Sequence, residues 1–453
     1  MKQKEDPQFK LMTTEPVSRL IPRLAVPTVL SMMITGVYNT ADTYFVSQLG
    51  TSASAAVGIV FSLMAIIQAI GFTLGMGCGS IISRRLGEKN LEAANVSGSS
   101  AFASAIFFGV LLSVISLSHL EGLVELLGAT PTIVPFAEDY AKWILLGSPV
   151  ICSCFVMNNI LRSEGHAKFS AVALTSGGIL NMLLDPLFIY TFNLGTSGAA
   201  LATVASQTTS FLIFLQFFIR KKGTVSLGVK YVSLKLKTYA DIMTTGIPSL
   251  FRQGLASVAT IFLNTSAGLY GDAAISAMTI ATKVVMLCGS LMIGIGQGFS
   301  PVAGYNYGAG LYKRVKAAWK WTALVSTCLL LFLGGMIFAF APQIVRWFRN
   351  DDRVVSVGVF ALRAQALSFP LHALIISINM LMQSCGKKLQ ATFLSLNRQG
   401  IYFIPLVIVL PKIMGLTGVE ISQACADILS ALTAIPYLLL FFRELNKAEK
   451  AAL

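Results

Sequence analysis

Long apolar stretches separated by short polar connectors run along almost the whole chain of 453 residues. Twelve stretches have the length of about 20 residues that an α-helix needs to cross the hydrocarbon core of a bilayer. They begin near Leu20, Ala53, Val96, Ile133, Phe169, Ser197, Ala240, Ala273, Ala318, Val355, Ala391 and Leu416. The pattern therefore predicts an all-α membrane protein with twelve transmembrane helices and no separate soluble domain.

The composition supports this prediction. Hydrophobic residues make up 55% of the chain and charged residues 12%, and the mean hydropathy is +0.73. Charged residues make up about a quarter of an average soluble domain. A water-soluble core could not absorb so much apolar sequence.

The net charge of +14 is concentrated in alternate connectors. Basic clusters lie at 84–89, 162–168, 220–237, 313–320 and 387–388, whereas the connectors between them are neutral, acidic or mixed. An excess of Lys and Arg marks cytoplasmic connectors, so we expect a multi-pass protein of the cell membrane with both termini in the cytoplasm. This explains the charge without nucleic acid, which we do not expect as a partner.

The two halves of the chain resemble each other at a constant spacing of 221 residues, without a gap. The shift places Pro27 on Pro248, Gly50 on Gly271, Gly75 on Gly296 and Gly87 on Gly308. Six spans in each half make the repeats parallel, related by a pseudo-twofold axis along the membrane normal. We predict an N-terminal lobe over 1–222, a cytoplasmic linker over 223–237 and a C-terminal lobe over 238–453.

Two such lobes are typical of a carrier, in which one lobe rocks against the other and exposes a central site to each side in turn. Pro27 and Pro248 each remove a backbone donor inside an early span, so each can act as a helix hinge. The alternative interpretation is that both prolines are merely tolerated in membrane helices.

Several segments, in order along the chain, carry a family resemblance. They are 37–42 (VYNTAD), 75–79 (GMGCG) with 84–87 (RRLG), 160–165 (ILRSEG), 180–186 (LNMLLDP), 294–298 (GIGQG) with 306–308 (NYG), and 396–399 (LNRQ). Together they resemble the multidrug and toxic compound extrusion (MATE) exporters, and most nearly their DinF-like bacterial branch. The resemblance implies two six-helix lobes and export of drugs or metabolites against an inward flux of sodium or protons.

Acidic residues at membrane depth are costly and are therefore functional candidates. Tyr38, Asn39 and Asp42 share one face of the first span, and Asn181 and Asp185 share one face of the fifth. If the faces meet, the two carboxylates resist joint ionisation, so one binds a proton or a cation lies between them. We predict a coupling site for a proton, or for sodium at Asp42, Asn181, Asp185 and Thr203, where the resemblance implies the threonine. A structural hydrogen-bonded network is the alternative.

Other polar residues within the spans are weaker candidates for lining a cavity. In span four either Asn158 or Asn159 could face it, or both could join helices by hydrogen bonds. In the second half Arg252, Gln253 and Asp427 are candidates, with further basic residues at Lys283, Arg363 and Arg398. Some MATE branches carry an acidic residue in span seven, where this chain has Arg252. The basic residues could pair with Asp427, attract an anionic part of a substrate, or extend their charged ends toward the membrane surface.

These observations predict a secondary active exporter, an antiporter driven by proton or sodium entry, for hydrophobic and often cationic small molecules. We expect a monomer in the lipid bilayer, with no cofactor other than the coupling ion, and not an enzyme. No G-x-x-x-x-G-K-[ST] nucleotide loop occurs. The alternative is a lipid-linked saccharide flippase of the same superfamily, which the basic residues of the second half support.

Overall fold

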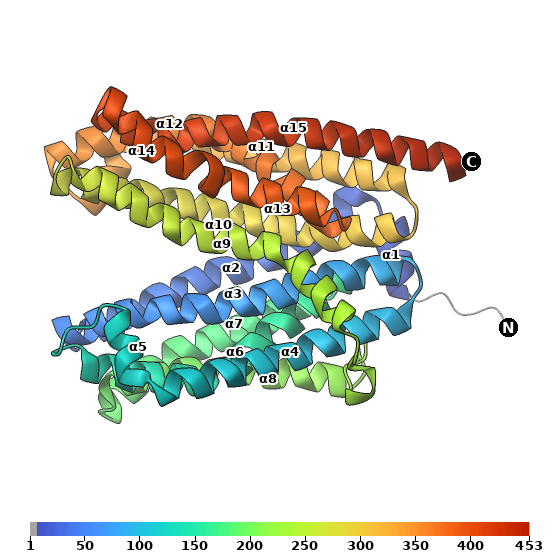
Figure 1. Ribbon diagram of the computed structural model, residues 1–453, viewed down its shortest axis with the longest axis horizontal. Coiled ribbons are helices and arrows are strands. Elements are labelled where there is room, and N and C mark those ends of the chain that lie inside the picture. The colour runs from blue at the N-terminus through green and yellow to red at the C-terminus, as the bar shows by residue number, and fades with distance from the viewer. Residues whose placement is uncertain (1–6, 453) are drawn as a thin grey trace. The chain divides into compact units, whose positions relative to one another are not determined.

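The computed structural model describes residues 7–452, which form helices joined by short connectors (Figure 1). The first half contains α1 (Pro7–Thr14), α2 (Val17–Ser47), α3 (Thr51–Gly87), α4 (Leu91–Ser118), α5 (Leu120–Leu126), α6 (Val134–Ser163), α7 (Ala167–Pro186), the π-helix η1 (Leu187–Thr191), α8 (Gly195–Ile219) and the 3₁₀ turn η2 (Val229–Tyr231). The second half contains α9 (Leu236–Gly268), α10 (Asp272–Gly308), α11 (Tyr312–Phe348), α12 (Asp352–Ser384), α13 (Lys388–Leu396), the π-helix η3 (Asn397–Phe403), α14 (Ile404–Met414) and α15 (Leu416–Ala452).

The twelve predicted spans are all helical. Eleven helical segments within the described residues are long and apolar enough to cross a membrane. The twelfth predicted span is α9, which has 33 residues but is less apolar than the other eleven. Arg252 and Gln253 lie at the middle of α9 and lower its hydropathy. The least apolar span is thus the one that carries a charge at its centre.

The internal repeat extends to the helix boundaries. The helices that begin at Thr51, Leu91, Ala167 and Gly195 have counterparts that begin at Asp272, Tyr312, Lys388 and Leu416, each 221 residues later. Gly50 and Gly271 precede the first pair with φ of 119° and 94°, a conformation that residues with a Cβ rarely adopt. The spacing seen in the sequence therefore reflects two halves built from the same series of helices.

The chain divides into two compact units, and each unit contains a short segment from the other half of the chain. Within the described residues, one unit comprises 7–9 and 26–246, and the other comprises 10–25 and 247–452. The chain therefore passes from one unit to the other inside α2, next to Pro27, and inside α9, next to Pro248. The predicted lobe boundaries at 222 and 238 differ from these, and the predicted twofold relation and hinges stay predictions.

A stripe of glycines lets helices of the first unit approach closely. A Cβ at Gly71, Gly75 or Gly79 of α3 would lie within 3.0 Å of atoms in α6. A Cβ at Gly246 of α9 would lie 1.9 Å from the carbonyl oxygen of Thr73. Small residues at such spacing are the usual means by which membrane helices pack. The second unit repeats the last contact, since a Cβ at Gly298 would lie 2.4 Å from Cα of Ala25.

The connector after α8 is bound to the first unit. The buried carboxylate of Glu164 accepts hydrogen bonds from the backbone N–H groups of Thr224 (2.9 Å) and Val225 (3.3 Å). The side chain of Asn95 accepts one from the N–H of Ser226 at 2.8 Å. These contacts place the segment that we predicted as a linker within the first compact unit.

Candidate functional site

The predicted acidic cluster lies in the first unit, on α2, α7 and α8. Asn181 and Asp185 are one helical turn apart on α7 and are 1% and 0% exposed. Pro186 ends this helix, and the chain continues in the π-helix η1. A proline and a local π-helix both disturb the regular ladder of backbone hydrogen bonds. The cluster is thus built where the backbone of span five changes its helical geometry.

Close packing of α2 on α7 brings the two predicted faces together. A Cβ at Gly178 would lie 2.9 Å from the ring of Tyr38, so the glycine makes room for the tyrosine. Asp42 is one turn beyond Tyr38 on α2, and it lies close enough to Asp185 to interact with it electrostatically. The face of α2 that carries Tyr38 and Asp42 therefore meets the face of α7 that carries Asn181 and Asp185.

Thr203 of α8 completes the predicted set. The amide nitrogen of Asn181 donates to Asp185 Oδ1 at 3.3 Å and to Thr203 Oγ1 at 3.4 Å. Thr203 is 5% exposed. Carboxylate, amide and hydroxyl oxygens from three helices therefore converge at one place.

The structure adds one residue that the sequence did not indicate. Tyr140 of α6 is 1% exposed, and it lies near Asp42, Asp185 and Thr203. Its hydroxyl is 3.8 Å from Sδ of Met64. In the sequence Tyr140 stands between Asp139 and Lys142, close to the start of its span, so no local pattern marked it. Its proximity to the acids depends on how α6 packs in the unit.

Three oxygens of the cluster are buried without a donor. Among the described residues, Asp42 Oδ1, Asn181 Oδ1 and Asp185 Oδ2 have no hydrogen-bond partner. All three atoms are acceptors, so a cation or an added proton would satisfy them, whereas another acceptor would not. The described chain has no group of three His, Cys, Asp or Glu residues suited to a metal. The residues fit a proton, or a hard monovalent cation such as sodium, better than a transition metal.

The remaining polar candidates of the first half are held by local hydrogen bonds. Asn158 accepts a hydrogen bond from the hydroxyl of Ser170. The amide of Asn159 donates to the carbonyl of Phe155 at 2.7 Å and accepts from Arg162. Both asparagines are buried. The contact of Asn158 joins α6 to α7, as in the helix-joining interpretation, whereas these two contacts of Asn159 stay within α6. For Asn39 the described contacts involve its backbone carbonyl, which accepts from a hydroxyl one turn away.

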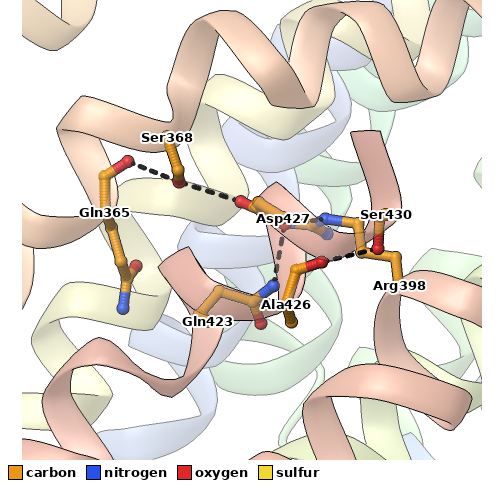
Figure 2. Close-up of polar contacts among 7 residues, drawn as sticks. All are labelled: Gln365, Ser368, Arg398, Gln423, Ala426, Asp427 and Ser430. Atoms are coloured by element: carbon orange, nitrogen blue, oxygen red, sulfur yellow. Dashed lines mark hydrogen bonds and ion pairs between the residues drawn. The ribbon is translucent and has the colours of Figure 1, made fainter. Parts of the chain in front are cut away.

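In the second unit Asp427 forms a buried ion pair with Arg398 (Figure 2). Arg398 Nε donates to Asp427 Oδ1 at 2.7 Å, and Gln423 Nε2 donates to the same oxygen at 3.1 Å. The hydroxyl of Ser368 donates to Oδ2 at 2.9 Å. Both carboxylate oxygens thus have donors, whereas Asp42 and Asp185 each have one oxygen without a donor. One of the predicted alternatives, that a basic residue pairs with Asp427, is therefore observed. The network of Ser368, Arg398 and Asp427 joins α12, η3 and α15.

The other basic residues of the second half lie apart from Asp427. The guanidinium of Arg252 donates to Asn379 Oδ1 at 3.0 Å and to Ser249 Oγ at 3.3 Å. Arg363 packs on the ring of Phe338, and Lys283 is exposed. Gln253 is partly exposed next to Arg252. Among the described residues, no hydrogen bond or ion pair joins Arg252 or Gln253 to Asp427.

Comparison with known sequences identifies the family. The sequence profile of the MatE family matches residues 27–187 and 248–409. The multidrug export protein MepA of Staphylococcus saprophyticus is 27% identical over 450 residues, which cover 98% of this chain and 99% of the relative. MepA of Staphylococcus aureus strain MRSA252 is 26% identical over 440 residues, which cover 96% and 97%. These relatives are transporters, not enzymes.

Solved structures agree in fold over nearly the whole chain. An outward-facing conformation of a multidrug resistance MATE family transporter of the MOP superfamily has a TM-score of 0.91 at 27% identity, covering 98% of this chain and 99% of that chain. A MATE structure described as the bent conformation has a TM-score of 0.92 at 26% identity, with the same coverage. Since the family profile matches one long segment in each half and most of the chain in total, the chain belongs to the MatE family of multidrug and toxic compound extrusion transporters.

Proposed function

We propose that this protein is a secondary active exporter of small molecules, in which an inward flux of protons or sodium ions through the first unit drives outward transport. The coupling residues are Asp42 and Asp185, assisted by Asn181, Thr203 and Tyr38. Alternating access between two lobes, with bending of α2 at Pro27 and of α9 at Pro248, is the transport mechanism in this proposal.

The three buried acceptor oxygens carry the proposal. An unsatisfied buried polar group costs roughly 1–3 kcal/mol, and a fold retains such a cost mainly where a function uses it. A proton on either carboxylate turns one acceptor oxygen into a hydroxyl group. A neighbouring oxygen can then accept a hydrogen bond from that hydroxyl. A sodium ion would instead be held by the oxygens of Asp42, Asn181, Asp185 and Thr203. A proton and a sodium ion would therefore satisfy the same buried oxygens.

Coupling follows from thermodynamic linkage. If ion binding favours one conformation of the cluster and substrate binding favours another, each ligand weakens the binding of the other by the same factor. Asp42 lies on α2, the helix that Pro27 interrupts in its hydrogen bonding. A change at Asp42 can therefore be transmitted along α2 to the point where the chain passes between the compact units.

The substrates in this proposal are hydrophobic and often cationic. The names of the relatives describe multidrug export, which supports a broad range of small molecules. The one-sided basic connectors support a cell-membrane protein with both termini in the cytoplasm, and we propose that it acts as a monomer. A lipid-linked saccharide flippase is not favoured, because the matched relatives are multidrug exporters and the unsatisfied groups are acids.

Substitution of the two acids tests the proposal. In proteoliposomes with an imposed ion gradient, Asp42→Asn and Asp185→Asn should each reduce efflux of a fluorescent cation at least about tenfold, because an amide cannot carry the proton or the charge. Asp272→Asn changes an exposed carboxylate at the start of α10 and should leave efflux unchanged. Full efflux by Asp42→Asn, in protein that is inserted and monodisperse, would refute the assignment.

A further inference from the structure

The charged residue at the centre of α9 has only neutral hydrogen-bond partners in the described residues, unlike the ion-paired Arg398. Arg252 is the middle residue of a helix that runs from Leu236 to Gly268, so it lies near the middle of the predicted span. Its partners are the amide oxygen of Asn379 and the hydroxyl of Ser249, both of them neutral. Within the described residues Arg252 forms no ion pair. The positive charge is therefore uncompensated at membrane depth.

The second unit itself provides a comparison. Arg398 is also located within a span, but Asp427 neutralises it, and Gln423 and Ser368 complete that network (Figure 2). A buried ion pair of this kind can be explained by structure alone. Arg252 lacks any such partner, and its Nε atom is buried without a hydrogen bond. The structural explanation that covers Arg398 does not extend to Arg252.

Partial exposure indicates what Arg252 faces. The side chain is neither buried nor fully exposed. An arginine at the centre of a membrane helix that faced lipid would be very costly, and such residues almost always face the interior of a bundle or a water-filled pathway. A transporter must contain such a pathway. A partly exposed Arg252 is therefore accessible to a solute in transit.

The neighbouring residues hold the guanidinium in a fixed orientation. Asn379 is 3% exposed, and its amide donates to the carbonyl of Ala391 and to the hydroxyl of Ser395, both at 2.8 Å, so its oxygen points to Arg252. Ser249 is fully buried and also accepts a hydrogen bond from Gln383 at 3.0 Å. Positioned in this way, the remaining N–H groups of Arg252 are donors that a planar anion can accept in pairs.

We infer that Arg252, positioned by Asn379 and Ser249, is a binding site for the anionic group of an amphiphilic solute, a carboxylate or a phosphate attached to an apolar body. The inference rests on the proposed function in one respect, since it describes part of a transported substrate. It extends that function from cationic molecules to zwitterionic and anionic ones. The two halves then differ in purpose: acids of the first unit bind the coupling ion, and a base of the second binds substrate.

A pair of probes that differ in one carboxylate tests this inference. Rhodamine B carries a free carboxylate and its ethyl ester does not, while the aromatic body and the cationic charge are the same. Fluorescence polarisation on the purified full-length protein should give a Kd for rhodamine B that is about tenfold lower than for the ester, as expected for a charge-assisted bidentate contact. Equal Kd values for the two probes would overturn the inference.

Variants locate the effect at Arg252. Arg252→Gln should raise the Kd for rhodamine B about tenfold and leave the Kd for the ester unchanged. Arg252→Lys keeps the charge but not the planar fork, so the preference should fall severalfold. An unchanged preference in either variant would contradict the inference. Arg363→Gln is the matched control, because it removes a positive charge from α12 that contacts Phe338 instead, and it should alter neither Kd.

A further arm identifies the source of the anion. Phosphatidylglycerol, added to the same protein in mixed micelles, should displace rhodamine B if a lipid headgroup also occupies the site, and the zwitterionic lipid phosphatidylcholine should not. If either lipid displaced the ester but not rhodamine B, the result would contradict an anion site. Because binding is measured without an ion gradient, failure of this inference is distinct from failure of ion-coupled export.

Discussion

The oxygens of Asp42, Asn181 and Asp185 show at the scale of single residues why the first unit can bind an ion. Each residue buries one acceptor oxygen without a donor, and each such atom costs roughly 1–3 kcal/mol. Asp427 shows the opposite arrangement, with three donors on its two oxygens. An acid that is already satisfied gains little from a cation. The acids Asp42 and Asp185 are therefore prepared for one, whereas Asp427 is not.

Tyr140 should contribute to ion binding although it carries no charge. Its hydroxyl is near both carboxylates and Thr203, and a hydrogen bond that it gives to a charged group when the ion binds would contribute about 1.5–3 kcal/mol. Tyr140→Phe should therefore raise the ion concentration for half-maximal efflux about tenfold or more. Tyr239→Phe is the control, since it removes a hydroxyl at the start of α9 that donates to the carbonyl of Ser233 at 2.7 Å. Similar ion dependence in both variants would contradict a role for Tyr140.

The sequence predicted the parts of this site that lie on single helices. The spacing of Asn181 and Asp185 follows from helical periodicity, and so does the shared face of Tyr38 and Asp42. Tyr140 could not be found in this way, because its approach to the acids depends on the packing of α6 against α2, α7 and α8. The hydrogen bond between Asn158 and Ser170 was undetermined for the same reason, because it joins α6 to α7.

At the scale of elements, close helix contacts occur where the sequence places glycine. Gly246 of α9 meets the backbone of Thr73, and Gly298 of α10 meets the backbone of Ala25. The two contacts are equivalent under the repeat, because in each case the first helix of one half packs on the second helix of the other half. No side chain fits between such backbones, so these positions fix how closely the helices approach.

Gly246→Ala should destabilise the protein. The new Cβ would lie 1.9 Å from a carbonyl oxygen, so α9 and α3 would have to separate, and overpacking of this kind costs roughly 1–3 kcal/mol. Gly254→Ala on the same helix meets nothing within 4 Å, and alanine favours a helix over glycine by about 1 kcal/mol. Thermal unfolding of the purified variants should therefore rank Gly254→Ala at or above the unmodified protein and Gly246→Ala well below it. Equal stability of the two variants would disprove the tight contact.

Helix positions were predictable, whereas deviations from regular helix were not. The hydropathy pattern located all twelve spans, and the shift of 221 residues holds for four pairs of helix starts. The short helices α1 and α5 and the π-helices η1 and η3 were absent from the prediction. The contacts of Glu164 with the connector were also not predicted. A carboxylate next to a basic cluster is normally expected to be exposed to solvent, and its burial depends on the fold.

At the scale of the whole molecule, one duplication provides the scaffold for two different kinds of chemistry. Both halves retain the same helix order and equivalent glycines and prolines. The first half carries the acids, and the second carries an uncompensated arginine at the centre of its first span. The duplication could be read from the sequence directly. The difference in how the charges are compensated needed the structure, since pairing depends on contacts between helices.

The most direct test of the central claim is to let a substrate gradient drive the ion. Proteoliposomes that impose only a substrate gradient would be monitored for internal pH and internal sodium at the same time. The account predicts that the unmodified protein moves one of the two ions against the substrate flow, and that Asp42→Asn and Asp185→Asn both abolish this ion movement while Asp272→Asn retains it. Ion movement by Asp42→Asn at the rate of the unmodified protein would contradict coupling at these acids.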